Sequence, residues 1–377
     1  MLWTDSFLDD MRNQADPLAD AVVAEIYAKG EVDAVDALMK TLVRNDGIPS
    51  DQLPPVVRDY LAATSVVPDL DPEAQRRAEN LFSLLGPEML MVLGFYSLPA
   101  AYAARKGVQV LYRTAYLAQR PVRRVFETTQ MVVDVLSPGG LSRDGKGLRT
   151  AQKVRLMHAA TRHLLTTDPA RPWDSNELGL PINQEDLAGT LTTFTWVVID
   201  GLEKMKIEVG REDREAYVQA WGSIARVLGL HEDLVPKSFA EAGTLADRIH
   251  TRQLAPSPEG AALAKALIEG YQSLMPDEHL KGMPASMLHF FLDKDPFTQR
   301  NVAAMLDVPP ADWTEELTRV ATVIGDALEI VSKHFDLGAK FLRWFGRGMV
   351  NAMLLVERGG QRAPFAIPDT LRAAWEL

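Results

Sequence analysis

A histidine between two arginines stands in the middle of a strongly helical segment, residues 147–167. At about 100° per helical residue, Arg155 and Arg162 both lie within roughly 60° of the direction of His158. His163 points about 140° away from His158 and is expected at the surface or in a second layer. An imidazole among small apolar residues can bind a haem iron, while same-side arginines bind propionates or brace the helix. The pattern also fits a core histidine that is hydrogen-bonded to a carbonyl group, with arginines at the surface.

A second segment, residues 121–135, reads PVRRVFETTQMVVDV and predicts a helix that begins at a proline. Arg124 and Thr128 share a face at i and i+4, and Glu127 lies beside them. An arginine, a hydroxyl and a carboxylate on an otherwise apolar helix can form the polar fringe of a pocket that orients dioxygen or shuttles a proton. The alternative is an Arg124–Glu127 surface pair worth a few tenths of a kcal/mol.

The sequence contains no cysteine, which excludes disulfides, iron–sulfur clusters and thiolate-ligated metals. It also contains no GxGxxG, P-loop or HExxH motif. The seven histidines are scattered, without two at metal-ligand spacing beside carboxylates on one helix face. These observations leave single-histidine chemistry, in which one imidazole holds a metal whose other ligands come from a cofactor.

The composition predicts a chain that folds around a large core. Of the 377 residues, 47% are hydrophobic, and the net charge is −11. An acidic chain is a poor partner for nucleic acid or anionic lipid. Residues 81–104 are about long enough to span a bilayer, but Gly86-Pro87-Glu88 and Pro99 interrupt them, so we expect a buried core helix and no transmembrane segment. The N-terminus shows no export signal, and we therefore expect a cytoplasmic protein.

Apolar residues recur at helical spacing along most of the chain, and alternating strand patterns are essentially absent. We therefore predict an all-α fold, a single multi-helical domain over residues 1–377. Further helices are expected at 20–42, 183–206, 212–228, 258–274 and 313–334. Helices that begin with an acidic residue followed by a proline are expected at Asp71 and after Thr167. Residues 251–260 are the best candidate seam, although no clear linker divides the chain.

The two segments that contain His158 and Arg124 resemble the latex clearing protein (rubber oxygenase) family. That family belongs to a wider group of haem proteins that includes the fungal oxygenase of mycophenolic acid biosynthesis. The resemblance rests on a V-R-x-x-H-A-x-x-R helix, here residues 154–162, and on the spacing of Arg124 and Thr128 before it. Further similarity runs through residues 180–191, 217–236 and 364–375.

The resemblance implies a non-covalent haem b in a globin-like core at about residues 81–240, with peripheral C-terminal helices at about 258–377. His158 would be the axial ligand of the iron, and Arg155 and Arg162 would bind propionates or brace the helix. Arg124 and Thr128 would support the distal side. The implied reaction is O₂-dependent cleavage of an isoprenoid double bond, with Glu127 as a base that takes a proton from an allylic carbon or an oxygen intermediate.

Two departures from the family pattern affect the expected substrate. Rubber-cleaving members carry a lysine directly before the distal threonine, where this chain has Glu127. A carboxylate is a poorer partner for ferrous haem, so an open or water-bound sixth site is expected. Rubber-cleaving members are also exported, whereas this chain is expected inside the cell. A small lipophilic, unsaturated substrate is therefore the expectation. The alternatives are a non-catalytic haem or lipid carrier and a helical scaffold without a cofactor.

Several other residues are predicted to have mainly structural roles. Asn183 is expected to cap a helix over residues 187–205, whose side chains at Thr190, Thr193, Phe194 and Trp196 are candidates to cover the pocket. Trp221 is expected to be a packing anchor. A methionine-rich and aromatic stripe is expected in the core rather than in a lipophilic pocket wall: Met89, Met91, Phe95 and Tyr96. Asp312 is expected to be a helix cap, and residues 358–362 are expected to form a turn.

Overall fold

The structure is a computed structural model that describes residues 3–31, 53–114, 121–273 and 281–310. Within these ranges it contains helices and no strand, and a single β-bridge joins Ala104 to Leu254. The all-α prediction is therefore confirmed. The predicted helix at 313–334, the cap at Asp312 and the segments 358–362 and 364–375 lie outside the described residues.

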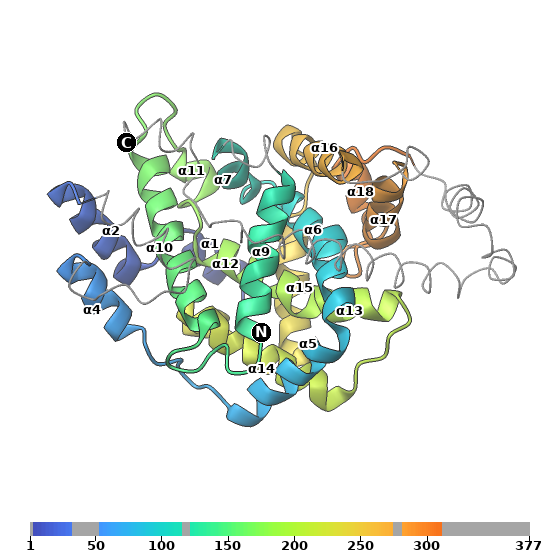
Figure 1. Cartoon of the computed structure of the whole chain (residues 1–377). Helices are drawn as coiled ribbons and strands as arrows, with labels where there is room; N and C mark the ends of the chain where they lie inside the picture. Colours follow the sequence, from blue (N-terminus) through green and yellow to red (C-terminus); the bar gives the residue numbers. More distant parts are fainter. Residues whose placement is uncertain (1–2, 32–52, 115–120, 274–280, 311–377) are drawn as a thin grey trace, which may run out of the picture.

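The N-terminal half supplies the two helices that carry most of the predicted site, α9 and α10 (Figure 1). Its elements are α1 (Asp5–Arg12), α2 (Pro17–Lys29), α4 (Pro55–Ala63), α5 (Pro72–Val92), the π-helix η2 (Leu93–Ser97), α6 (Leu98–Tyr102), α7 (Val108–Arg113), α9 (Pro121–Leu136) and α10 (Lys146–Thr167). Asp71 caps α5 by accepting hydrogen bonds from the amides of Glu73 and Ala74, as its acid-then-proline sequence predicts.

The C-terminal half of the described chain supplies the remaining walls. Its elements are α11 (Ser175–Leu178), α12 (Gln184–Phe194), α13 (Trp196–Lys204), α14 (Arg211–Val227), the 3₁₀ turn η3 (Glu232–Leu234), α15 (Phe239–Gln253), α16 (Pro258–Ser273), α17 (Met283–Leu292) and α18 (Val302–Met305). In Figure 1, α2 and α4 lie on one flank beside α10, and α16 to α18 lie on the other flank.

Three helix predictions are corrected by the structure. The helix expected at 20–42 begins earlier, at Pro17, and ends at Lys29, where Gly30 adopts a left-handed conformation with φ 67°, and residues 32–42 lie outside the described residues. The helix expected at 183–206 is two helices, because the chain turns sharply at Thr195, which has φ −104° and ψ −86°. The start expected after Thr167 is wrong, because α10 ends there and the next helix begins only at Ser175. Asp168 instead accepts hydrogen bonds from the amides of Ala170 and Arg171 and closes a turn.

The expected core helix at 81–104 is also bent. It comprises the end of α5, the π-helix and α6. The straight part that ends at Gly86 and the straight part that begins at Glu88 meet at an angle of 81°. Met89, Met91, Phe95 and Tyr96 in this stretch are at most 3% exposed, so the core prediction for the stripe is confirmed. No single described helix combines the length and the apolar composition that a bilayer crossing needs, although this bent pair passes that test as a pair.

The core has two parts, and α10 joins them. A large cluster of buried side chains is formed mainly by α5, α9, α12–α15 and the helices that follow. A smaller cluster packs α2 and α4 against Leu156 and Ala159 of α10. Helix α10 also approaches α9 closely at its start, where a Cβ atom on Gly147 would lie 2.5 Å from the Cα atom of Val135. This contact requires glycine and places the faces of α9 and α10 side by side.

Candidate functional site

A cavity of about 330 Å³ lies among α2, α6, α7, α9, α10, α12, α14 and α15. Most of its walls are aliphatic or aromatic, and several small residues, such as Ala101, Gly107 and Ala160, leave room for a ligand. A mostly apolar cavity with a few convergent polar groups is the usual form of a small-molecule site.

His158 of α10 borders this cavity. Its Nδ1 atom is buried and has no hydrogen-bond partner among the described residues. Burial lowers the pKa of His158 to about 3, and the positive charges of Arg124 and Arg162 act in the same direction. The imidazole is therefore neutral at physiological pH, and a neutral imidazole is the form that binds a metal. The alternative of a core histidine bonded to a carbonyl group does not match these contacts.

Arg155 and Arg162 hold α10 against the N-terminal part of the chain. The Nε and Nη2 atoms of Arg155 lie 2.5 and 2.8 Å from the carboxylate of Asp16, the residue that caps α2. Arg162 pairs with Asp20 of α2 and donates to the carbonyl oxygens of Pro181 and Ile182 at 3.0 and 2.9 Å. Among the described residues, neither Arg155 nor Arg162 lines the cavity. Of the two predicted roles, these contacts support bracing of the helix.

Arg124, Glu127 and Thr128 of α9 all line the same cavity as His158. Glu127 is buried, and its carboxylate lies 4.0 Å from the guanidinium of Arg124, whose side chain is 30% exposed. The hydroxyl of Thr128 donates to the carbonyl oxygen of Arg124 at 2.9 Å. The structure thus brings four of the six predicted site residues to one cavity, while their chemical roles remain predictions.

The sequence analysis missed Lys153, which lies one turn and a half before His158 on α10 and is only 3% exposed. Burial lowers its pKa to about 7, although the negative charges of Glu127 and Asp134 oppose this shift. Lys153 is therefore a second cation, besides Arg124, that acts on the carboxylate of Glu127. The available signal was a lysine inside the apolar stretch of a helix that was predicted to be buried.

The burial of Lys153 predicts a pH dependence of stability. An unfolded lysine keeps its proton up to about pH 10.4, whereas folded Lys153 loses it near 7. Between these values the unfolded chain binds more protons, so this group makes the free energy of unfolding rise with pH. Relative to Lys153→Met, we expect the unfolding free energy of the wild type to rise by up to about 1.4 kcal/mol per pH unit between about pH 7.5 and 9.5.

Urea unfolding at three pH values measures this difference. Lys146→Met is the control, because Lys146 is exposed at the start of the same helix and should leave the pH dependence unchanged. Parallel curves for the wild type and Lys153→Met would contradict the expectation.

A second group that the sequence analysis missed lies where α12 and α15 border the cavity. His250 is 5% exposed and lines the cavity, and its Nδ1 atom lies 2.7 Å from a carboxylate oxygen of Asp295. Burial opposes ionisation of Asp295, but the hydrogen bonds that its carboxylate accepts from His250 and Thr298 outweigh burial and lower the pKa of Asp295 to about 2. These two residues are far apart in sequence, and no local pattern links them.

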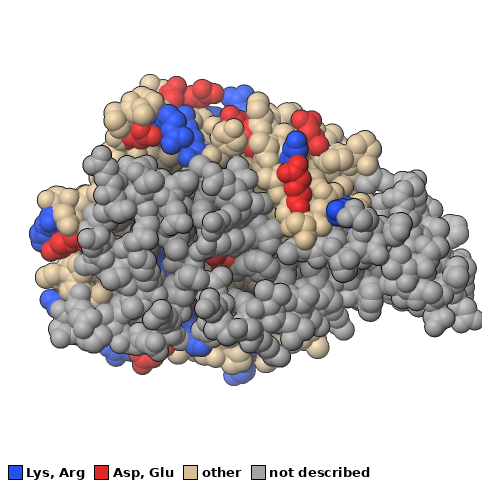
Figure 2. Space-filling view, turned by 45° about the horizontal axis from the view of Figure 1, so that its top comes forward, with Lys and Arg blue, Asp and Glu red and all other residues tan. Residues whose placement is uncertain are grey.

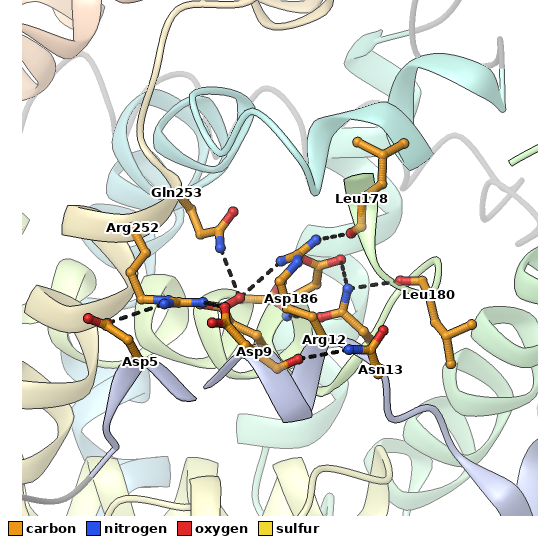
Figure 3. A network of polar contacts seen from close by, with 12 residues as sticks. Asp5, Asp9, Arg12, Asn13, Leu178, Leu180, Asp186, Arg252 and Gln253 are labelled. Atoms are coloured by element: carbon orange, nitrogen blue, oxygen red, sulfur yellow. Dashed lines mark hydrogen bonds and ion pairs between the residues drawn. The ribbon is translucent and has the colours of Figure 1, made fainter. Parts of the chain in front are cut away.

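Glu185 also lines the cavity and belongs to a polar network that includes Arg12, Arg252 and Gln253, all three of which are labelled in Figure 3. The carboxylate of Glu185 accepts hydrogen bonds from the guanidinium of Arg12 at 3.1 Å, from the guanidinium of Arg252 at 2.8 Å and from the side-chain amide of Gln253 at 2.8 Å. Burial raises the pKa of Asp186, although the charge of Arg12 opposes the shift. The network joins α1, α12 and α15 and fixes this wall of the cavity.

The predictions for α12 and α14 are confirmed. Asn183 caps α12 by accepting a hydrogen bond from the amide of Asp186 at 2.9 Å. Thr190, Thr193 and Phe194 line the cavity, whereas Trp196 of α13 is not among the described residues that line it and packs against Phe239 and Phe297. Trp221 is 1% exposed and stacks on Phe194 with ring centroids 4.8 Å apart, so it is a packing anchor that also forms cavity wall.

Charge on the described surface is mixed. Acidic and basic side chains lie next to one another on the face shown in Figure 2, over the part of it that the structure describes. The described part of this face shows no continuous basic patch.

Comparisons with known proteins agree with the fold and the placement of these helices. The family model described as "ER-bound oxygenase mpaB/B'/Rubber oxygenase, catalytic domain" matches residues 75–344. The chain is 29% identical over 255 residues to the rubber oxygenase of Streptomyces sp. (strain K30), and the match covers 67% of this chain and 62% of that protein's length. It also resembles a structure of latex clearing protein in the closed state, with a TM-score of 0.72 and 24% identity, covering 89% of this chain and 91% of that one. The match over residues 75–344, most of the chain and all of α9 and α10, shows that this protein belongs to the family of ER-bound oxygenases mpaB/B' and rubber oxygenases.

Proposed function

We propose that this protein is a haem b-dependent oxygenase that uses O₂ to cleave or oxygenate an unsaturated, isoprenoid-like lipophilic substrate. The observation that carries the proposal is His158, a neutral imidazole that borders an apolar cavity together with Arg124, Glu127 and Thr128. The family supports an oxygenase, and the relative from Streptomyces is named a rubber oxygenase.

The residues around His158 fit an iron porphyrin. An imidazole that is neutral, buried and without a protein partner at Nδ1 has no structural task that would compete with metal binding. The aliphatic and small residues of the cavity suit a flat apolar macrocycle. Haem b bound there would supply an iron centre at which O₂ can react. His158 would hold the iron, and Arg155 and Arg162 would keep the ligand helix in place through Asp16 and Asp20.

The walls of the cavity point to the substrate class. Apolar side chains provide the favourable surface for a hydrocarbon chain and exclude water from it. In the proposed reaction one C=C bond and one O₂ molecule give two carbonyl groups, so all atoms are retained in the products. Arg124 and Thr128 would orient the reacting end of the substrate, since both line the cavity from α9.

Glu127 would act as the base that takes a proton from an allylic carbon and returns it to the product, through a carboxylate that interacts with the charges of Arg124 and Lys153. We expect Glu127→Gln to lower the turnover of a short polyisoprene oligomer by about a hundredfold, because an amide cannot accept that proton. The amount of bound haem should not change, because Glu127 is not the iron ligand. Oxygen consumption and the haem spectrum measure the two quantities.

The control for this variant is Glu73→Gln, which neutralises an exposed carboxylate on α5 and should leave turnover unchanged. Full turnover in Glu127→Gln would remove the proposed role of Glu127 without affecting the proposal of an oxygenase.

An absorption spectrum of the purified protein tests the proposed cofactor. We expect a Soret band, a shift of that band on reduction with dithionite, and a further shift when carbon monoxide binds the reduced protein. A protein that stays colourless after haem is added would contradict the proposal. A haem protein that consumes no O₂ with any unsaturated lipid would be a carrier instead of an oxygenase.

A further inference from the structure

A buried hydrogen-bond acceptor without a partner lies beside a histidine on the wall that α15 contributes to the cavity. His250 and Gln253 are i and i+3 on this helix, both line the cavity, and each is 5% exposed. The Oε1 atom of Gln253 is buried and has no hydrogen-bond partner among the described residues. A buried acceptor left unpaired costs free energy, which a bound donor would recover.

The orientation of the side-chain amide of Gln253 is fixed by Glu185. Its Nε2 atom lies 2.8 Å from a carboxylate oxygen of Glu185, which also accepts from Arg12 at 3.1 Å and from Arg252 at 2.8 Å. A carboxylate paired with two guanidinium groups only accepts hydrogen bonds, so the amide must direct its NH₂ group toward Glu185. The carbonyl oxygen of Gln253 is then the atom that remains for a ligand.

The tautomer of His250 is fixed in the same way. Asp295 accepts hydrogen bonds at one oxygen from the amide of Phe297 at 3.2 Å and from the amide of Thr298 at 2.7 Å. Its other oxygen lies 2.7 Å from Nδ1 of His250. A neutral His250 therefore carries its proton on Nδ1 and leaves the lone pair of Nε2 as a second acceptor. Phe297 packs edge-on against the ring at 5.3 Å and restricts its rotation.

We propose that His250 and Gln253 form a recognition site for a hydroxyl group, so that the preferred ligand of the cavity is an isoprenoid alcohol rather than a pure hydrocarbon. The inference deepens the proposed function, since it takes the cavity to be the substrate site. Two acceptors favour a group that donates, and they disfavour a carbonyl or ether group, which only accepts. The apolar walls would hold the chain while this polar wall fixes which end of it enters first.

Binding of three matched probes to the purified protein tests this inference: farnesol, farnesal and the methyl ether of farnesol. Isothermal titration calorimetry at a single pH measures the three affinities. We expect farnesol to bind about tenfold more tightly than the other two, since only the alcohol has a proton that it can donate to one of the two acceptors. Gln253→Met should reduce this preference while Glu185 keeps both of its arginine partners. His250→Phe should also reduce it.

Asp295→Asn provides a sharper test that does not depend on removing a side chain. The asparagine oxygen can keep the bonds to the Phe297 and Thr298 amides, and its NH₂ group then donates to Nδ1 of His250. The histidine proton moves to Nε2, which becomes a donor. We expect farnesal to gain affinity in this variant relative to farnesol.

Equal affinity of the wild type for all three probes would overturn the inference, as would an unchanged preference in both Gln253→Met and His250→Phe. The absorption spectrum recorded before each titration separates this outcome from failure of the proposed function. A preparation with a Soret band but no preference for the alcohol rejects only the hydroxyl site, whereas a colourless preparation that prefers the alcohol rejects only the haem.

Discussion

The His158→Ala variant is expected to be purified without haem and to consume no O₂ with an unsaturated lipid. His158 is the imidazole that borders the cavity beside Arg124, Glu127 and Thr128, and its low pKa keeps it available to a metal at all physiological pH values. An alanine has no atom that can take its place as a ligand. The Soret absorbance per protein and the rate of oxygen consumption measure the loss.

His163→Ala is the matched control, because it removes a second imidazole from the same helix. His163 stacks on Tyr27 with ring centroids 4.3 Å apart and does not line the cavity that the described residues form. Its replacement should leave the Soret band in place. Added imidazole should restore part of the band in His158→Ala, because a free imidazole can enter the space that the side chain leaves. An unchanged Soret band in His158→Ala would contradict the assignment of the axial ligand.

The second large effect is expected from Arg12→Met, which should lower the free energy of unfolding by about 3–5 kcal/mol. Arg12 is 3% exposed, and its guanidinium contacts Glu185 at 3.1 Å and Asp186 at 3.0 Å. It also donates to the carbonyl oxygen of Leu178. Methionine fills similar space but leaves buried carboxylates without this partner, and the uncompensated charge is the main cost. Urea unfolding monitored by circular dichroism measures the change.

Two further variants separate charge from packing. Arg76→Met breaks an exposed i,i+3 pair with Glu73 and should cost no more than about 0.5 kcal/mol. Adding Asp186→Asn to Arg12→Met should recover part of the loss, because it removes one of the unpaired buried charges. A loss in Arg12→Met as small as that in Arg76→Met would show that the network contributes little to stability.

Local pattern in the sequence determined the helical elements and several of their ends. The positions of α9, α10, α14 and α16 follow from apolar residues at helical spacing and from proline or glycine at the ends. The common face of Arg124 and Thr128 follows from the geometry of one helix, and the structure places both on the cavity wall. The cap at Asn183 also needs only the residues next to it.

The partners of the charged side chains depended on contacts between distant segments. Helical geometry predicts Arg155 and Arg162 on the side of His158, yet both pair with aspartates at the start of α2, which are more than a hundred residues away in the sequence. The same holds for His250 with Asp295. A spacing rule describes a single helix, and it carries no information about which other helix packs against it.

The sequence by itself determined that this chain is helical and free of cysteine. It also determined which helix carries His158 and which carries Arg124, Glu127 and Thr128. Only the tertiary structure decided that these helices share one cavity, that Lys153 is buried near Glu127, and that α15 adds the unpaired acceptor of Gln253 to the wall. The physical reason is that secondary structure follows from interactions within a few residues. A site, in contrast, is formed by burial and charge pairing between segments that meet only when the chain packs.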